Sequence, residues 1–121
     1  MKWQNMASSL KSPALFQRHA AAVAERYAQI YPAIMINGPR QSGKTTLATT
    51  VFPKHPYVSL EDLEVQAAVK NDPHAFINKY RNGAIFDEVQ HAPSLLSYLQ
   101  GVIDANDATG RFIITGSQNF V

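Results

Sequence analysis

The chain has 121 residues, of which 45% are hydrophobic and 17% are charged, so it suits one packed domain and leaves little room for a second. The net charge of +2 is weak evidence for a nucleic-acid partner, which stays unknown. The absence of cysteine excludes disulfides and thiolate metal sites, and the four scattered histidines form no metal-ligand spacing.

Membrane and secretory classes are also disfavoured. No apolar run in the sequence approaches the roughly 18 residues that span a bilayer. The amino terminus lacks the apolar block of a signal peptide. We therefore expect a cytoplasmic protein.

The amino-terminal region predicts a loose segment, then a helix and a buried strand. Residues 1–12 are polar and aperiodic, whereas Pro13, with Ser12 as its cap, can open a helix. Apolar side chains then share one helical face, and Pro32 ends that pattern. The apolar run at 33–37 has the length of a strand buried in a parallel sheet.

Helical and strand patterns alternate through the rest of the chain. Ser59 and Asp62 fit a capping box that opens a helix. The expected elements are helices at 43–51, 59–70, 73–80 and from 93 onward, and strands at 57–59, 84–86 and 112–115. This alternation predicts an α/β fold of three layers with a mostly parallel sheet, as in P-loop NTPases.

The strongest signal follows the strand at 33–37, where the sequence matches G-x-x-x-x-G-K-[ST]. Such a loop turns backbone N–H groups inward as an anion nest, and the next helix directs its positive end at the phosphates. Lys44 would contact the β- and γ-phosphates, and Thr45 would offer its hydroxyl to Mg²⁺. The expected nucleotide-contacting residues are Gly38, Pro39, Arg40, Gln41, Ser42, Gly43, Lys44, Thr45 and Thr46. The alternative is a glycine-rich turn with a surface lysine, which the flanking strand and helix disfavour.

An acidic pair supplies the second half of the expected site. Asp87 and Glu88 directly follow the apolar strand at 84–86, and ligands of open α/β sheets bind at the carboxyl ends of strands. We expect Asp87 to serve in the Mg²⁺ shell and Glu88 to orient the attacking water. Taken alone, such a pair is more often a solvated strand end, so this assignment depends on the phosphate loop.

A polar segment at 115–119 follows the last expected strand. A side chain there could contact the γ-phosphate or the attacking water. Ser117 is the first candidate, followed by Thr115 and Asn119. A turn of small polar residues explains the same segment equally well.

GTP-binding patterns are incomplete. The letters D-x-x-G at 107–110 precede a strand instead of following one. The guanine-reading pattern N-K-x-D has Arg81 in place of its carboxylate. ATP with Mg²⁺ is therefore the expected cofactor pair, although nothing in the sequence reads adenine directly.

Four separated blocks carry a resemblance to a known family: YPAIMINGPRQSGKTTL at 31–47, YVSLED at 57–62, IFDEVQHAP at 85–93 and FIITGSQN at 112–119. In this order they resemble the prokaryotic AAA-domain ATPases that carry a C-terminal domain of unknown function. The resemblance covers the chain from about residue 15 and implies a Walker A motif at 38–45, a Walker B motif at 84–88 and a sensor near Ser117. We therefore assign 13–121 to a partial AAA-type nucleotide-binding domain.

The sequence also departs from this family. Its members continue past the sensor strand through an arginine-bearing segment, whereas no arginine follows Ser117 here. The last sheet strand is missing from the expected elements, so the strand at 33–37 is predicted to be a sheet edge. We interpret the chain as a truncated product or half of a split protein, whose partners would be further copies or a complementary C-terminal fragment.

Three functions are compatible with these motifs. The first is hydrolysis of Mg²⁺·ATP, with Lys44, Glu88 and Ser117 as catalytic residues. The second is a non-hydrolysing nucleotide switch or inactive remnant, which the missing arginine favours because such a charge is worth about 10³–10⁵ in rate. A small-molecule phosphotransferase ranks last, because the sequence suggests no acceptor pocket or lid.

Overall fold

The computed structural model describes residues 3–5, 13–39 and 42–117. In this part of the chain, five strands form one sheet in the order β1-β2-β5-β4-β3, and all neighbouring pairs run parallel. The strands are β1 (Trp3–Asn5), β2 (Ala33–Gly38), β3 (Tyr57–Ser59), β4 (Ala84–Asp87) and β5 (Phe112–Ser117). The helices are α1 (Pro13–Ala28), α2 (Lys44–Val51), α3 (Leu63–Asn71), α4 (Pro73–Lys79) and α5 (Leu95–Ala105), with a short 3-10 helix, η2 (Val89–His91).

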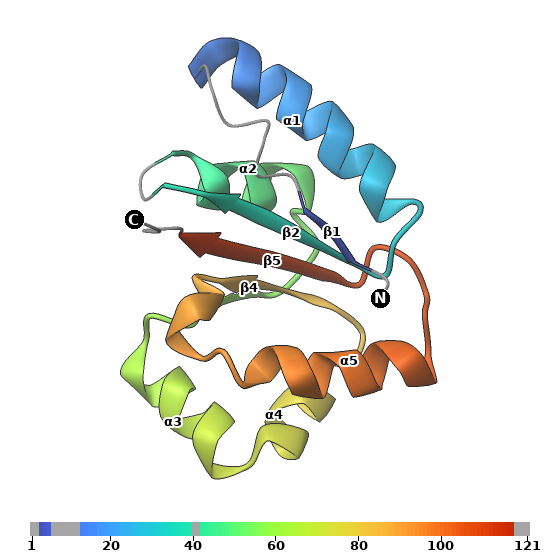
Figure 1. The fold of residues 1–121 in the computed structure, drawn as a ribbon. Coiled ribbons are helices and arrows are strands. Elements are labelled where there is room, and N and C mark those ends of the chain that lie inside the picture. Colours follow the sequence, from blue (N-terminus) through green and yellow to red (C-terminus); the bar gives the residue numbers. More distant parts are fainter. Residues whose placement is uncertain (1–2, 6–12, 40–41, 118–121) are drawn as a thin grey trace.

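Helices cover both faces of the sheet (Figure 1). The helices α1 and α2 lie on one face, and α3, α4 and α5 lie on the other. Each central strand alternates between the two resulting cores: in β5, Phe112 and Ile114 face the α3–α5 side, and Ile113 faces the α1–α2 side. The strands are apolar at successive positions because neither face meets water.

Aromatic side chains pack around the neighbouring strands β4 and β5. The rings of Phe76 and Tyr80 lie 6.0 and 5.8 Å from the ring of Phe86, which stacks on Phe112 at 6.0 Å. Burying side chains of this size stabilises a fold by about 1.5–3 kcal/mol each. This packing fixes β4 and β5 beside each other, so the residues that follow each strand have defined positions.

The structure confirms the expected three-layer α/β architecture with a parallel sheet. The strand expected at 57–59 is β3, and those expected at 84–86 and 112–115 continue into Asp87 and Ser117. The first helix begins at Pro13, as the sequence predicts. Among the helices described, none combines the length and the apolar character needed to cross a membrane.

The predicted sheet edge at β2 is wrong. Residues Trp3–Asn5 form β1, which pairs with β2 in parallel, with Trp3 opposite Ala33. A three-residue strand with two polar residues leaves no apolar run for sequence reasoning to detect. This part of the supposed loose segment 1–12 is therefore a strand, while the rest of that segment, including Ser12, lies outside the described residues.

Two helix starts also differ from the prediction. Asp62 caps α3, because its Oδ1 accepts a hydrogen bond from the Glu64 N–H at 2.8 Å. The Ser59 hydroxyl instead accepts from a backbone N–H two residues on, which forms a local turn that competes with a helix cap. The helix α5 begins at Leu95 and not at Pro93, because η2 and a turn follow β4.

Candidate functional site

The turn from β2 into α2 depends on one glycine. Gly43 has φ 89° and ψ 11°, in the left-handed region, and α2 begins at the next residue. Glycine adopts this conformation without the steric cost that a Cβ imposes. The first N–H groups of a helix lack intrahelical acceptors and carry the positive end of its dipole. The backbone therefore provides a positive potential at the loop where the sequence predicts a phosphate.

Lys44 links this loop to the end of β5. Its side chain is buried, with 4% of its surface exposed. The Lys44 ammonium donates to the Pro39 carbonyl at 2.9 Å and to Ser117 Oγ at 3.1 Å. A buried ammonium is retained only where such acceptors compensate for its lost water.

Asp87, at the end of β4, is the acceptor for three hydroxyl groups. Thr45 Oγ1 lies 3.1 Å from both carboxylate oxygens. Thr115 donates to Oδ1 at 2.5 Å, and Tyr57 donates to Oδ2 at 2.6 Å. These donors come from α2, β5 and β3, so one buried carboxylate links three elements together.

Tyr57 is a site residue that the sequence analysis missed. Its ring is about half exposed, yet its hydroxyl reaches Asp87. Partial burial, together with the hydrogen bond and the negative charge of Asp87, raises the pKa of Tyr57 to about 12. The phenol therefore remains a hydrogen-bond donor at neutral pH. Its role depends on β3 lying beside β4, which no local sequence pattern specifies.

Glu88 has an unusual backbone conformation. Its φ of 59° and ψ of 57° make it the one non-glycine residue with positive φ among those described. This conformation costs about 1–2 kcal/mol for a residue with a Cβ, and such residues concentrate at functional sites. The Glu88 carboxylate accepts from Ser117 Oγ at 2.7 and 3.0 Å, and its N–H donates to Thr115 Oγ1 at 2.9 Å.

The structure thus brings most of the sequence-predicted residues to one edge of the sheet. Hydrogen bonds join Lys44 to Ser117, Ser117 to Glu88, and Thr45 to Asp87. Thr115 is fully buried and donates a hydrogen bond to the carboxylate of Asp87. Thr46 lies exposed on α2. The residues Arg40, Gln41 and Asn119 lie outside the described part of the chain.

The residues present fit a phosphate group and Mg²⁺. The Ser42 hydroxyl is buried in the loop without a hydrogen-bond partner among the described residues. The oxygens of Thr45 and Asp87 suit Mg²⁺, which proteins bind through one or two carboxylates together with phosphate oxygens and water. The described residues contain no group of three or more His, Asp or Glu arranged as a metal site.

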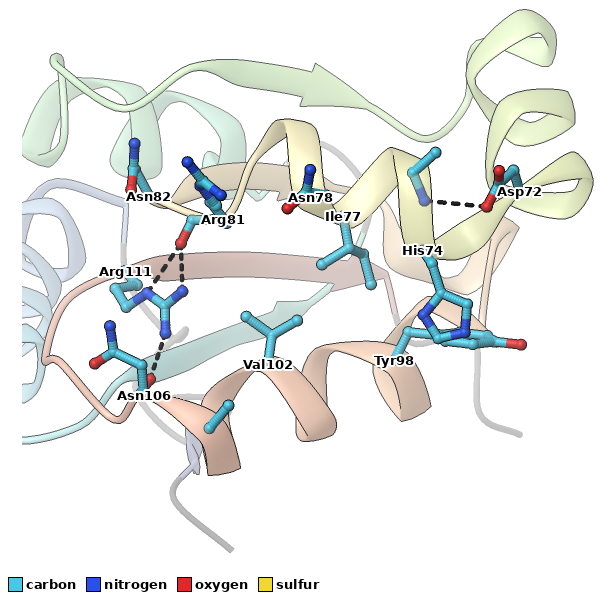
Figure 2. Close-up of a pocket in the computed structure, with 12 residues that line it drawn as sticks. Asp72, His74, Ile77, Asn78, Arg81, Asn82, Tyr98, Val102, Asn106 and Arg111 are labelled. Atoms are coloured by element: carbon cyan, nitrogen blue, oxygen red, sulfur yellow. Dashed lines mark hydrogen bonds between the residues drawn. The ribbon is translucent and has the colours of Figure 1, made fainter.

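A cavity lies at the opposite end of the sheet, between α4 and α5 (Figure 2). This cavity of about 760 Å³ is bordered by Arg81, Asn106 and Arg111, next to the amino ends of β4 and β5. The Arg111 guanidinium donates to the backbone carbonyls of Arg81 and Asn106 and lies 5.0 Å from the ring of Phe112. Partial burial lowers the pKa of Arg111. The sequence-predicted site residues do not line this cavity.

Comparison with known proteins identifies the family. A family model described as AAA domain matches residues 31–121. The chain belongs to this AAA domain family. The match spans the phosphate loop, the acidic pair and Ser117, and it makes the chain an AAA-type nucleotide-binding domain.

Curated relatives of this AAA domain are longer proteins. One from Mycobacterium bovis and one from Mycobacterium tuberculosis, both described as uncharacterised, are each 32% identical to it over 102 residues. The alignment covers 84% of this chain and 23% of each relative. No solved structure matches this chain.

Proposed function

We propose that this AAA domain binds Mg²⁺·ATP at the carboxyl edge of its sheet and hydrolyses the terminal phosphoanhydride bond. The observation that carries this proposal is the convergence of one ammonium and two carboxylates at this edge, where the Ser117 hydroxyl joins Lys44 to Glu88 and the Thr45 hydroxyl bonds to Asp87. Three of these groups, those of Lys44, Asp87 and Glu88, are at most 7% exposed. Apolar residues would stabilise a fold at least as well as buried ions, so such a cluster favours a functional role.

The phosphate loop would bind the triphosphate. Backbone N–H groups at the start of α2 and the hydroxyl of Ser42 would donate to phosphate oxygens. Lys44 would exchange its present acceptors, the Pro39 carbonyl and Ser117 Oγ, for oxygens of the β- and γ-phosphates. Mg²⁺ bound near Thr45 and Asp87 would supply charge neutralisation on the phosphates.

Glu88 would orient the water. Its carboxylate would accept a hydrogen bond from a water molecule and direct the water oxygen toward the γ-phosphorus. The water oxygen forms the new bond to phosphorus while the bond to the β–γ bridging oxygen breaks, so ADP and inorganic phosphate leave and the water proton ends on phosphate. A positioned base of this kind contributes about 10²–10⁴ in rate.

A nucleotide switch without turnover is the second candidate. It is favoured by the state of Glu88, because both of its carboxylate oxygens accept from Ser117. That carboxylate would have to change partners before it could hold water. If Glu88 kept its hydrogen bonds to Ser117 while ATP was bound, the protein would bind the nucleotide without hydrolysing it.

Glu88→Gln tests the proposal. The variant keeps the length of the side chain but loses the charged acceptor, so phosphate release should fall by on the order of 10²-fold. ATP affinity measured by calorimetry should stay within about twofold, because phosphate binding depends on the loop. Glu25→Gln, on the exposed surface of α1, is the matched control and should change neither quantity.

Two outcomes would change the conclusion. If the unmodified protein binds Mg²⁺·ATP but releases no phosphate, the switch function replaces hydrolysis. If the unmodified protein does not bind ATP at all, both candidate functions fail.

A further inference from the structure

We infer that Gln90 is a positioning residue for Glu88, because its carboxamide bridges the ends of β4 and β5. The inference rests on the proposed function of this site, since it concerns how the water-orienting carboxylate is held. Gln90 lies in η2, two residues after Glu88, and contacts neither the phosphate loop nor Asp87 in the hydrogen bonds described.

Both ends of the Gln90 carboxamide are engaged. Its Nε2 donates to Glu88 Oε1 at 3.1 Å, and its Oε1 accepts from the Ser117 N–H at 3.2 Å. A carboxylate only accepts and a backbone N–H only donates, so the two partners impose the same orientation on the carboxamide. The Ser117 hydroxyl donates to Glu88 and closes a ring of three residues.

This ring of hydrogen bonds lies just beyond the last paired residues of β4 and β5. The ladder between β4 and β5 ends at the pair Phe86 and Ile114. Beyond this pair, the Ser117 N–H finds its acceptor in the Gln90 side chain instead of a backbone carbonyl. Gln90 therefore replaces a rung of the ladder and adds a link between the two strand ends, beyond the contacts of Thr115 with Asp87 and with the Glu88 N–H.

The bridge becomes important when a nucleotide is bound. In the structure, Ser117 Oγ accepts a hydrogen bond from Lys44 and donates one to Glu88. A phosphate that draws Lys44 and the Ser117 hydroxyl toward itself would weaken the Ser117 contact with Glu88. Gln90 would still donate to the Glu88 carboxylate and keep it at the end of β5, where the attacking water is expected.

Two substitutions separate this role from general stability. Gln90→Met has a similar length without hydrogen-bonding groups, and Gln90→Glu keeps an acceptor for the Ser117 N–H but places a carboxylate against Glu88. Both should lower kcat by on the order of tenfold, because small misplacements of a catalytic group reduce rate strongly. KM and ATP affinity should stay within about twofold, and the loss should be larger for Gln90→Glu.

Gln100→Met is the matched control for these variants. Gln100 donates to Asp104 one turn along α5, away from the carboxyl edge of the sheet. Its substitution should leave kcat and KM unchanged. Equal kcat values for Gln90→Met and the unmodified protein would overturn the inference while leaving the proposed hydrolysis intact.

A second measurement does not require turnover. In the ligand-free protein, the side-chain NH₂ resonances of Gln90 should be displaced from the position of a free glutamine by the Glu88 carboxylate. Glu88→Ala should return them to that position and leave the Gln100 resonances in place. Gln90 resonances at the free position in the unmodified protein, or unmoved by Glu88→Ala, would refute the bridge whether or not ATP is hydrolysed.

Discussion

At the carboxyl end of the sheet, Lys44 and Glu88 bond to a shared side chain, and Lys44 also bonds to the Pro39 carbonyl. At the amino end, the hydrogen bonds described for Arg111 go to backbone carbonyls. Lys44 and Glu88 share the Ser117 hydroxyl. The carbonyls of Arg81 and Asn106 belong to the main chain that follows α4 and α5. The cavity of about 760 Å³ is at the amino end, yet the charged side chains that share one partner are at the carboxyl end. A shared side-chain partner is therefore the feature that supports the proposed nucleotide site, whereas the cavity at the amino end contains none of its residues.

Lys44→Ala should have the largest effect, a loss of ATP affinity at the carboxyl end of the sheet. Removing the ammonium removes charge-assisted hydrogen bonds to phosphate, each worth about 1.5–3 kcal/mol, so ATP affinity should fall by at least about 100-fold. Calorimetric titration with Mg²⁺·ATP measures this loss. Lys54→Ala, in an exposed turn, is the control and should bind normally. An unchanged affinity in Lys44→Ala would remove the phosphate-loop assignment.

Arg111→Met should lower stability and spare the nucleotide site. The substitution keeps an apolar chain over Phe112 but removes the donors to the carbonyls of Arg81 and Asn106. The free energy of unfolding in urea should fall by about 1–2 kcal/mol, while ATP affinity stays within about twofold. Arg18→Met, on the exposed face of α1, should leave both unchanged. A loss of ATP affinity in Arg111→Met would show that the two ends are coupled.

Tyr57→Phe should give the smallest effect, and one that depends on pH. At neutral pH the lost hydrogen bond to Asp87 should cost less than about 1 kcal/mol, since Tyr57 is about half exposed. The pKa of Tyr57 is raised from 10.0 to about 12, so its stabilising contribution is complete below pH 10 and is lost between pH 10 and 12. Urea unfolding of both proteins at pH 8 and pH 11 measures this loss. Parallel declines in the two proteins would contradict the assignment.

Much of the fold could be predicted because its signals are local. The apolar run at 33–37 and the glycine after it mark a buried strand entering a phosphate loop. The apolar positions of α5 fall on one helical face, and Leu95, Leu99 and Ile103 are the ones that become fully buried. Each of these patterns can be recognised without knowing what lies beside it.

The missed features depend on contacts between distant segments. Tyr57 reaches Asp87 because β3 lies beside β4, and Gln90 reaches Ser117 because β4 lies beside β5. The strand β1 forms because β2 offers a row of backbone groups, although its own residues carry little strand signal. The sequence shows that positions 57 and 90 carry polar side chains. It does not show which residues of the neighbouring strands they bond to.

The position of β1 has a practical consequence for anyone preparing this protein. Residues Trp3–Asn5 are distant in sequence from the phosphate loop, but they lie one strand away from it in space. An affinity tag or a proteolytic cut near these residues would disturb the pairing of β1 with β2, the strand that leads into the phosphate loop. Tags are better placed elsewhere, and a trimmed preparation should be checked for self-association before its nucleotide affinity is interpreted.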